Sequence, residues 1–290
     1  MSYVSDEIAS QPSCWERAAS LAPVAPLPGR GLRVAVVGCG TSLYMARAWA
    51  ALREVAGYGE TDAFPASEFP SGRRYDAVVA ITRSGTTTEI VELVRSLAGH
   101  VRTTVITADG SLPAGAAADH VVELPFADER SVVQTRFATT TLALLRASLG
   151  EPLDAVVADG RAALAESLPD ALLNRPHQVF LGTGWRVGLA EESALKLREA
   201  AQAWTEAYPA MEYRHGPISV ASSESAVWVF GTAPSGLADE IAATGALVVT
   251  AQLDPMALLV RAQRVAVALA ERRGLDPDAP RNLTRSIVLH

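Results

Sequence analysis

Short apolar segments alternate along the chain with longer segments in which apolar residues recur every three or four positions. The short segments lie at residues 33–37, 76–82, 102–107, 120–124, 179–181, 226–231 and 246–251. Runs of this length, rich in β-branched residues, predict buried strands. Because segments with helical periodicity separate them, the pattern predicts an α/β fold with parallel sheets.

Helical periodicity extends over residues 5–22, from the Gly-rich turn near residue 40 to about residue 55, and over 87–99, 134–149, 188–203 and 255–274. Pro12 interrupts the first of these helices, and the density of Pro and Gly makes 22–31 a loop. The tail at 275–290 is expected to be mostly extended.

The two halves of the chain resemble each other. Gly38-Cys39-Gly40 closes one predicted strand and Gly182-Thr183-Gly184 closes another, and each is followed by an Ala-rich helix that carries Leu-Arg-Glu. This internal similarity predicts a duplicated architecture. We expect an N-terminal helix and linker at 1–30, a first domain at 31–152, and a second domain with the C-terminal tail at 153–290.

Composition narrows the class of protein. The chain has 290 residues, 49% of them apolar and 20% charged, with a formal net charge of −7. An acidic chain is a poor binder of a nucleic-acid backbone, and no apolar run is long enough for a transmembrane helix. The N-terminus does not resemble a signal peptide, and the cysteines and histidines lack metal-ligand spacing. We therefore expect a cytoplasmic protein without metal, cofactor, nucleic acid or membrane partner.

The turn after the first predicted strand, Gly38-Cys39-Gly40-Thr41-Ser42, precedes a helix. Free N–H groups at a helix start favour an anion. A dinucleotide fingerprint would need a further Gly at position 43, which is Leu. Helix capping by Thr41 or Ser42 is the alternative interpretation, and this motif alone does not decide between the two.

The turn after the second predicted strand, residues 82–88, carries five hydroxyls, one guanidinium and one Gly. Hydroxyls and backbone amides at a helix N-terminus suit a phosphate monoester. The turn has no lysine of the kind that binds nucleoside triphosphates. A capping turn with surplus Ser and Thr is the alternative, and the phosphate interpretation is favoured.

Lys196, Glu199 and His215 form a third candidate group. Lys196 is the only lysine among 25 basic residues, and it lies three residues before Glu199 on a predicted helix, so the two share a face. Glu and His are common acid–base residues, whereas a surface ion pair and a structural histidine are the ordinary alternatives.

Together these motifs resemble the double SIS (sugar isomerase) domain family, and most closely the isomerase half of glucosamine-6-phosphate synthase and its stand-alone relatives. The matching segments are Glu7–Pro12, Gly38–Ser42, Ala66–Phe69, Arg83–Gly85, Ser131–Thr140, Ala194–Glu199, Glu212–Pro217 and Pro280–Leu283. The resemblance implies two SIS subdomains, each a parallel five-stranded sheet flanked by helices.

The resemblance also assigns roles. Glu199 would be the base that moves a proton between C1 and C2, Lys196 the lysine of the catalytic helix, and His215 the ring-opening histidine. Because the family usually supplies that histidine from the second subunit, a homodimer with shared active sites is expected. The substrate-binding residues would be Gly40, Thr41, Ser42, Thr82, Arg83, Ser84, Thr87, Gln134 and Arg285.

Two residues depart from the family pattern. Arg83 replaces the usual Gln, and Arg285 replaces a lysine that contacts the open-chain sugar. Arginine stays protonated and cannot form a Schiff base. The predicted function is an aldose–ketose isomerase or deaminase acting on an aminosugar 6-phosphate of the glucosamine 6-phosphate type through C2 proton abstraction. The alternatives are a dehydratase or lyase on N-acetylglucosamine 6-phosphate and a non-catalytic sugar-phosphate sensor.

Overall fold

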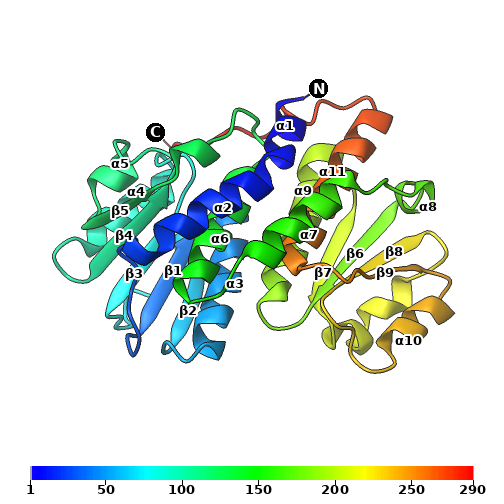
Figure 1. Ribbon diagram of the computed structural model, residues 1–290, viewed down its shortest axis with the longest axis horizontal. Coiled ribbons are helices and arrows are strands. Elements are labelled where there is room, and N and C mark those ends of the chain that lie inside the picture. The colour runs from blue at the N-terminus through cyan, green and yellow to red at the C-terminus, as the bar shows by residue number, and fades with distance from the viewer. Residues whose placement is uncertain (1, 290) are drawn as a thin grey trace. The chain divides into compact units, whose positions relative to one another are not determined.

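The computed structural model describes residues 2–289, which form two compact units (Figure 1). The five-strand unit comprises Ser13–Arg130, Gln134–Leu153 and the residues from Thr284 onward. The four-strand unit comprises the residues before Ser13, together with Ser131–Val133 and Asp154–Leu283.

The five-strand unit is built on one parallel sheet with the strand order β2-β1-β3-β4-β5. Its strands are β1 (Val34–Gly38), β2 (Thr61–Pro65), β3 (Ala77–Ile81), β4 (Arg102–Thr107) and β5 (His120–Glu123). Strands β1 and β3 are buried along their whole length, as in a parallel sheet covered on both faces.

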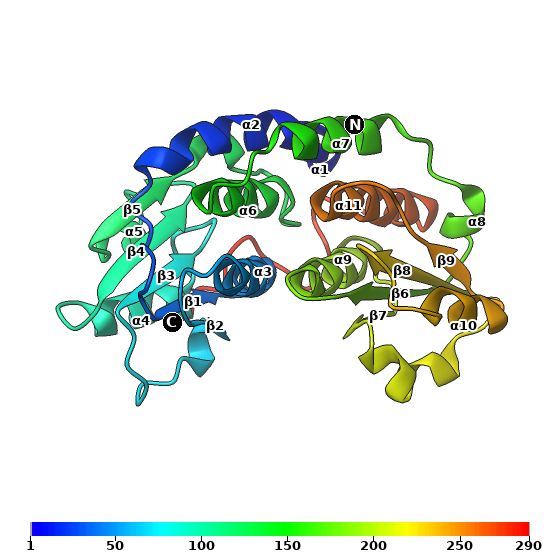
Figure 2. The same cartoon turned by 60° about the horizontal axis from the view of Figure 1, so that its bottom comes forward.

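Helices cover both faces of this sheet (Figure 2). They are α2 (Gln11–Leu21, most of which belongs to this unit), α3 (Thr41–Val55), α4 (Thr88–Leu97), α5 (Pro113–Ala116) and α6 (Arg136–Ser148). Helices α4 and α5 pack on the face that carries Ala35 and Val37, and α3 and α6 contact each other on the opposite face.

The four-strand unit has a parallel sheet with the order β7-β6-β8-β9. Its strands are β6 (His177–Gly182), β7 (Thr205–Pro209), β8 (Ser225–Phe230) and β9 (Leu247–Val249). Its helices are α1 (Tyr3–Ala9), α7 (Asp154–Ala165), α8 (Asp170–Leu173), α9 (Arg186–Ala201), α10 (Leu237–Ala243) and α11 (Pro255–Arg272). Helix α11 contacts both α9 and α7 and is buried along most of its length.

The predicted α/β class and the two parallel sheets flanked by helices are confirmed. The prediction of five strands in each sheet is wrong for the second sheet, which has four strands within residues 2–289. Both sheets nevertheless place their strands in the same sequential order, since β2-β1-β3-β4 corresponds to β7-β6-β8-β9. This shared order agrees with the internal similarity seen in the sequence.

Strands β2 and β7 were not predicted from the sequence pattern. Each lies at a sheet edge, pairs only with the strand before it in sequence, and is only partly buried. Each also ends in a proline, which an edge strand tolerates because one side of its backbone has no ladder to complete. Because an edge strand is only partly buried, it lacks the continuous apolar run by which the central strands are predicted.

Three other features bear on the sequence predictions. The N-terminal helix is divided between Ala9 and Gln11, and Pro12 occupies the first turn of the second piece, where it is tolerated. The tail after α11 forms neither helix nor strand as far as Leu289. No helix within residues 2–289 is long and apolar enough to cross a bilayer.

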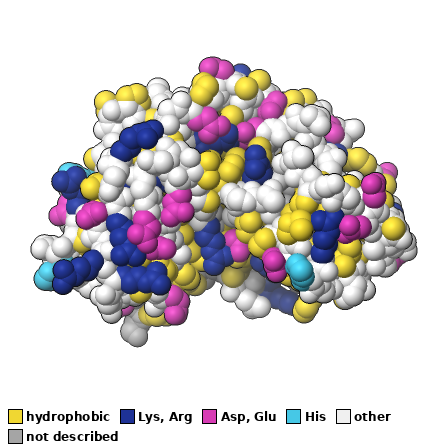
Figure 3. Space-filling model, turned by 90° about the horizontal axis from the view of Figure 1, so that it is seen from below, with side chains coloured by type: hydrophobic (Ala, Val, Ile, Leu, Met, Phe, Trp, Pro, Cys, Tyr) yellow, Lys and Arg dark blue, Asp and Glu magenta, His cyan; other side chains and the backbone are white. Residues whose placement is uncertain are grey.

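Figure 3 shows basic and acidic side chains interspersed on the lower face of the five-strand unit.

Candidate active site

The turn after β1 is shaped by two glycines. A Cβ on Gly38 would lie 2.6 Å from the backbone of Ser42, so only glycine allows this approach of strand and helix. Gly40 has a positive φ of 54° and is the residue that precedes α3, with no side-chain cap. Thr41 and Ser42 are buried in the first turn of α3 and neither caps it from the preceding position. The capping alternative is therefore wrong for this turn.

Cys39 in the same turn is partly buried and hydrogen-bonded. Its Sγ donates a hydrogen bond to Glu89 Oε2 on α4 at 3.6 Å. Burial and the nearby Glu89 carboxylate raise the Cys39 pKa to about 11. A thiolate nucleophile at neutral pH is not expected from such a group.

The turn after β3 gathers hydroxyl groups. Ser84 Oγ and Thr87 Oγ1 lie 3.3 Å apart, and the Thr86 N–H donates to Ser84 Oγ. Gly85 has a positive φ of 63°, and a Cβ there would lie 2.9 Å from Leu112 Cβ. Thr87 precedes α4 without a side-chain cap hydrogen bond. The hydroxyls therefore do not serve as a helix cap, as the alternative interpretation required.

A cavity of about 360 Å³ opens beside this turn. Its lining residues are Arg83, Ser84, Thr86, Ala108, Asp109, Leu112, Asp128, Arg285 and Ser286. The structure thus brings Arg83, Ser84 and Arg285, which the sequence predicted as substrate-binding, to one cavity. The cavity lies at the carboxyl ends of β3 and β4, where ligands of parallel sheets bind.

Arg83 has a structural partner that explains its presence in the turn. It is buried, and its Nη1 lies 3.7 Å from Oε2 of the buried Glu129. Glu129 in turn accepts hydrogen bonds from the backbone N–H groups of Thr135, Arg136 and Phe137 at the start of α6. The guanidinium therefore links the hydroxyl turn to the N-terminus of α6 through a buried carboxylate.

The other predicted substrate-binding residues of this unit have different surroundings. Gly40, Thr41, Ser42, Thr82, Thr87 and Gln134 are not among the residues that line the cavity. Gln134 Nε2 is buried and has no hydrogen-bond partner among residues 2–289. A buried amide donor of this kind is available to an oxygen of a ligand. Gln134 thus remains a predicted binding residue with a donor to offer.

Lys196 and Glu199 lie on α9 of the four-strand unit. The Lys196 side chain is 1% exposed, and its Nζ lies 2.5 Å from Glu199 Oε2 and 3.4 Å from Oε1 of the fully buried Glu192. The Glu199 side chain is 18% exposed. The pair is therefore no surface ion pair, and its lysine is held between two carboxylates.

Glu192 is a residue that the sequence analysis missed. It lies four residues before Lys196 on the same helix, and this spacing could have identified it. Replacing Glu192 with Ala is expected to lower the free energy of unfolding by about 3 kcal/mol, because it removes one carboxylate from a buried lysine. Urea unfolding measures the change.

The control is Ala at Glu191, the neighbouring and only partly buried residue. Equal losses of stability in the two variants would contradict a special role for Glu192.

His215 lies at the end of a 3-10 turn, Glu212–His215. Tyr213 anchors the turn inside the unit, because its side chain is fully buried. The same burial, together with the nearby Glu206 carboxylate, raises the pKa of Tyr213 to about 12. Arg214 fixes it from outside through two hydrogen bonds with Glu240 at 2.7 and 2.8 Å. His215 itself is exposed, and its side chain forms no hydrogen bond within residues 2–289. The fold thus presents this imidazole outward on a firmly held turn.

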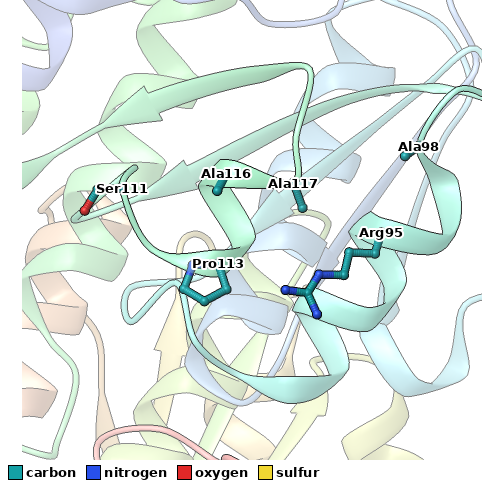
Figure 4. A pocket seen from close by; sticks show the side chains of 6 residues that line it. All are labelled: Arg95, Ala98, Ser111, Pro113, Ala116 and Ala117. Carbon is teal, nitrogen blue, oxygen red and sulfur yellow. The ribbon is translucent and has the colours of Figure 1, made fainter.

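A second cavity of the five-strand unit, about 450 Å³, lies beside α4 and α5 (Figure 4). It is lined by Arg95, Ala98, Ser111, Pro113, Ala116 and Ala117. None of these residues was predicted to bind substrate. Four of its six lining residues are alanine or proline, so the cavity at the hydroxyl turn is the stronger candidate for a phosphate.

Comparison with known proteins finds a matching family model and similar sequences. Residues 30–149 match the family model of the SIS domain. The chain is 28% identical over 319 aligned residues to a glutamine–fructose-6-phosphate aminotransferase (isomerizing) of Xylella fastidiosa, with 88% of this chain and 52% of the relative covered. The chain thus spans about half the length of this curated relative.

Solved structures share the fold over nearly the whole chain. A glucosamine-6-phosphate deaminase from Thermotoga maritima matches with a TM-score of 0.83 and 23% identity, covering 99% of this chain and 98% of that one. A tagatose-6-phosphate ketose/aldose isomerase from Escherichia coli matches with a TM-score of 0.79 and 20% identity, covering 100% and 97%.

Proposed function

Because residues 30–149 of this chain match the SIS domain model, we propose that the protein is an enzyme that processes a phosphorylated sugar. The reaction we propose is aldose–ketose isomerisation or deamination of an aminosugar 6-phosphate of the glucosamine 6-phosphate type. The observation that carries the proposal is the Glu199 carboxylate, which contacts a buried lysine and remains partly exposed to solvent. A carboxylate held in this way can accept a proton from a bound substrate.

In the proposed reaction, Glu199 removes the proton from C2 of the open-chain sugar. The C2–H electron pair forms a C1–C2 double bond, and the C1 carbonyl oxygen gains a proton, which gives an enediol or, with nitrogen at C2, an enolamine. Return of the proton to C1 produces the C2 ketone or imine. Water hydrolyses the imine to fructose 6-phosphate and ammonia.

Other residues have supporting roles in this proposal. Lys196 holds the Glu199 carboxylate in place. The hydroxyls of Ser84 and Thr87, with Thr82 beside them, bind the phosphate at the N-terminus of α4. The turn of Gly40, Thr41 and Ser42 and the Gln134 amide contact the sugar. No step needs a metal or an organic cofactor.

A dehydratase acting on N-acetylglucosamine 6-phosphate is the second candidate. In that reaction the same C2 carbanion expels the C3 hydroxyl as water and leaves an unsaturated sugar. It is favoured by the single lysine of the chain, which is buried and ion-paired, so that no free amine is offered for a Schiff base. Product analysis separates the two: free ammonia with fructose 6-phosphate, or a product that absorbs ultraviolet light.

We also propose a homodimer in which the second copy supplies His215. The exposed, unbonded imidazole supports this assembly, as do large apolar side chains exposed near it in the sequence. Trp204, Met211 and Val220 are 81%, 48% and 58% exposed. If these side chains form one contiguous patch, they would suit an interface with a second copy. Location in the cytoplasm stays a prediction.

Phosphate recognition is tested by thermal unfolding. Glucosamine 6-phosphate at a hundredfold excess over its Kd is expected to stabilise the folded protein by about 2.7 kcal/mol and to raise its Tm accordingly. Glucosamine without phosphate, at the same concentration, is expected to leave the Tm unchanged. Equal stabilisation by the two sugars would contradict the phosphate site.

A further inference from the structure

The segment Thr284–Leu289, here called the tail strap, lies against the hydroxyl turn of the five-strand unit. The backbone N–H of Thr88, the first residue of α4, donates to the Ile287 carbonyl at 3.1 Å. The Leu289 N–H donates to Thr88 Oγ1 at 2.9 Å. Arg83 Nη2 donates to the Arg285 carbonyl at 3.1 Å. The strap is therefore bound to both ends of the turn.

Ser286 occupies the centre of this contact. Its Oγ accepts hydrogen bonds from Ser84 Oγ at 3.1 Å and from Thr86 Oγ1 at 2.9 Å, and it lies 3.3 Å from Thr87 Oγ1. A hydroxyl has two lone pairs and one proton, so these three neighbours use its whole capacity. The Ser286 oxygen thus sits at the point on which the hydroxyls of the turn converge.

The donors that the strap satisfies are those that an anion would use. A guanidinium, three hydroxyls and a helix N-terminal N–H are the groups that bind phosphate oxygens in proteins. Here they contact three oxygens from consecutive residues: the Arg285 carbonyl, the Ser286 hydroxyl and the Ile287 carbonyl. The strap presents its oxygens to the turn much as a phosphate group would.

Building on the phosphate site of the proposed function, we propose that the tail strap is an internal competitor of the substrate phosphate. Ser286 Oγ holds the position of one phosphate oxygen, and binding of phosphate to the same hydroxyls displaces it. Because two oxygens cannot occupy the same position, a phosphate oxygen enters only when Ser286 Oγ leaves. Ser286 therefore cannot bind the phosphate as an additional ligand from its present position.

The anchor of the strap lies at Arg285. Its guanidinium donates to the Asp128 carboxylate and to the Glu129 carbonyl, away from the hydroxyls. Within residues 286–289, the hydrogen bonds to the turn are the neutral ones described above. Phosphate entry therefore releases Ser286–Leu289 from the turn, while Arg285 keeps the strap attached.

The experiment is titration calorimetry with inorganic phosphate on the full chain and on Ser286→Ala. The variant is expected to bind phosphate roughly two- to tenfold more tightly, because it no longer offers the competing hydroxyl. Ser96→Ala is the matched control, since Ser96 lies on α4 with its hydroxyl bonded to Leu93 and exposed. This control is expected to bind phosphate as the unmodified protein does.

Amide hydrogen exchange of the unmodified protein gives an independent readout. Phosphate is expected to speed exchange at Leu289, whose N–H loses its bond to Thr88 Oγ1. Equal or weaker phosphate binding by Ser286→Ala, or slower exchange at Leu289 with phosphate, would overturn the competitor role alone. Absence of phosphate and sugar-phosphate binding in both proteins would instead overturn the proposed function together with the strap.

Discussion

Replacing Glu199 with Gln is expected to slow exchange of the substrate C2 proton by about 10²–10⁴-fold. The amide keeps the size of the carboxylate and can still accept a hydrogen bond from Lys196, but it cannot accept a proton. Proton NMR in deuterated water, with a panel of hexose 6-phosphates, measures the exchange even when no net product accumulates. Only sugars that the enzyme processes are expected to exchange.

The matched control is Glu191→Gln, on the same helix and outside the Lys196 group. Binding of a non-reacting sugar-phosphate analogue is expected to survive in both variants, because neither change alters the hydroxyls of Ser84 and Thr87, which we propose to bind the phosphate. Exchange at the unmodified rate in Glu199→Gln would mean that another residue is the base.

Mixing two inactive variants is expected to restore activity. Homodimers of Glu199→Gln and of His215→Ala should each be nearly inactive. If each active site takes Glu199 from one chain and His215 from the other, a heterodimer has one site with both changes and one site with neither. Up to half of the activity of the unmodified dimer should return per heterodimer, measured after controlled subunit exchange.

Subunit exchange between two preparations of Glu199→Gln is the control and should restore nothing. Failure of the mixed heterodimer to regain activity would show that His215 acts within its own chain or has no part in catalysis. Full activity at dilutions where the protein is monomeric would contradict the shared site directly.

The sequence predicts a strand most clearly where both faces of that strand are buried. Strands β1 and β3 follow from continuous apolar runs, because a central parallel strand has no polar face. Edge strands β2 and β7 carry Asp62, Pro65, Glu206 and Pro209, so the same rule could not find them. That the second sheet has four strands within residues 2–289 could not be predicted locally either, since the expected five came from the family resemblance and not from a pattern of residues.

In the candidate site, too, some features could be predicted from the sequence and others depend on tertiary packing. Lys196 and Glu199 could be paired from the sequence, because three residues on a helix fix their common face. That Lys196 is buried, and that Glu192 completes the group, depends on the packing of α9 against α11 and the sheet. The sequence pattern also could not distinguish a surface ion pair from a buried lysine held between two carboxylates.

Features that depend on neighbours along the chain could be predicted from the sequence: the alternation of central strands with helices, the Gly-rich turn after β1, and the grouping of hydroxyls after β3. Only the tertiary structure decided which distant residues meet there. Arg83 meets Glu129, and Ser286 meets Ser84 across 202 residues of sequence. Helical and strand periods encode contacts within a few residues, whereas contacts over such separations arise only when sheet, helix and tail pack together.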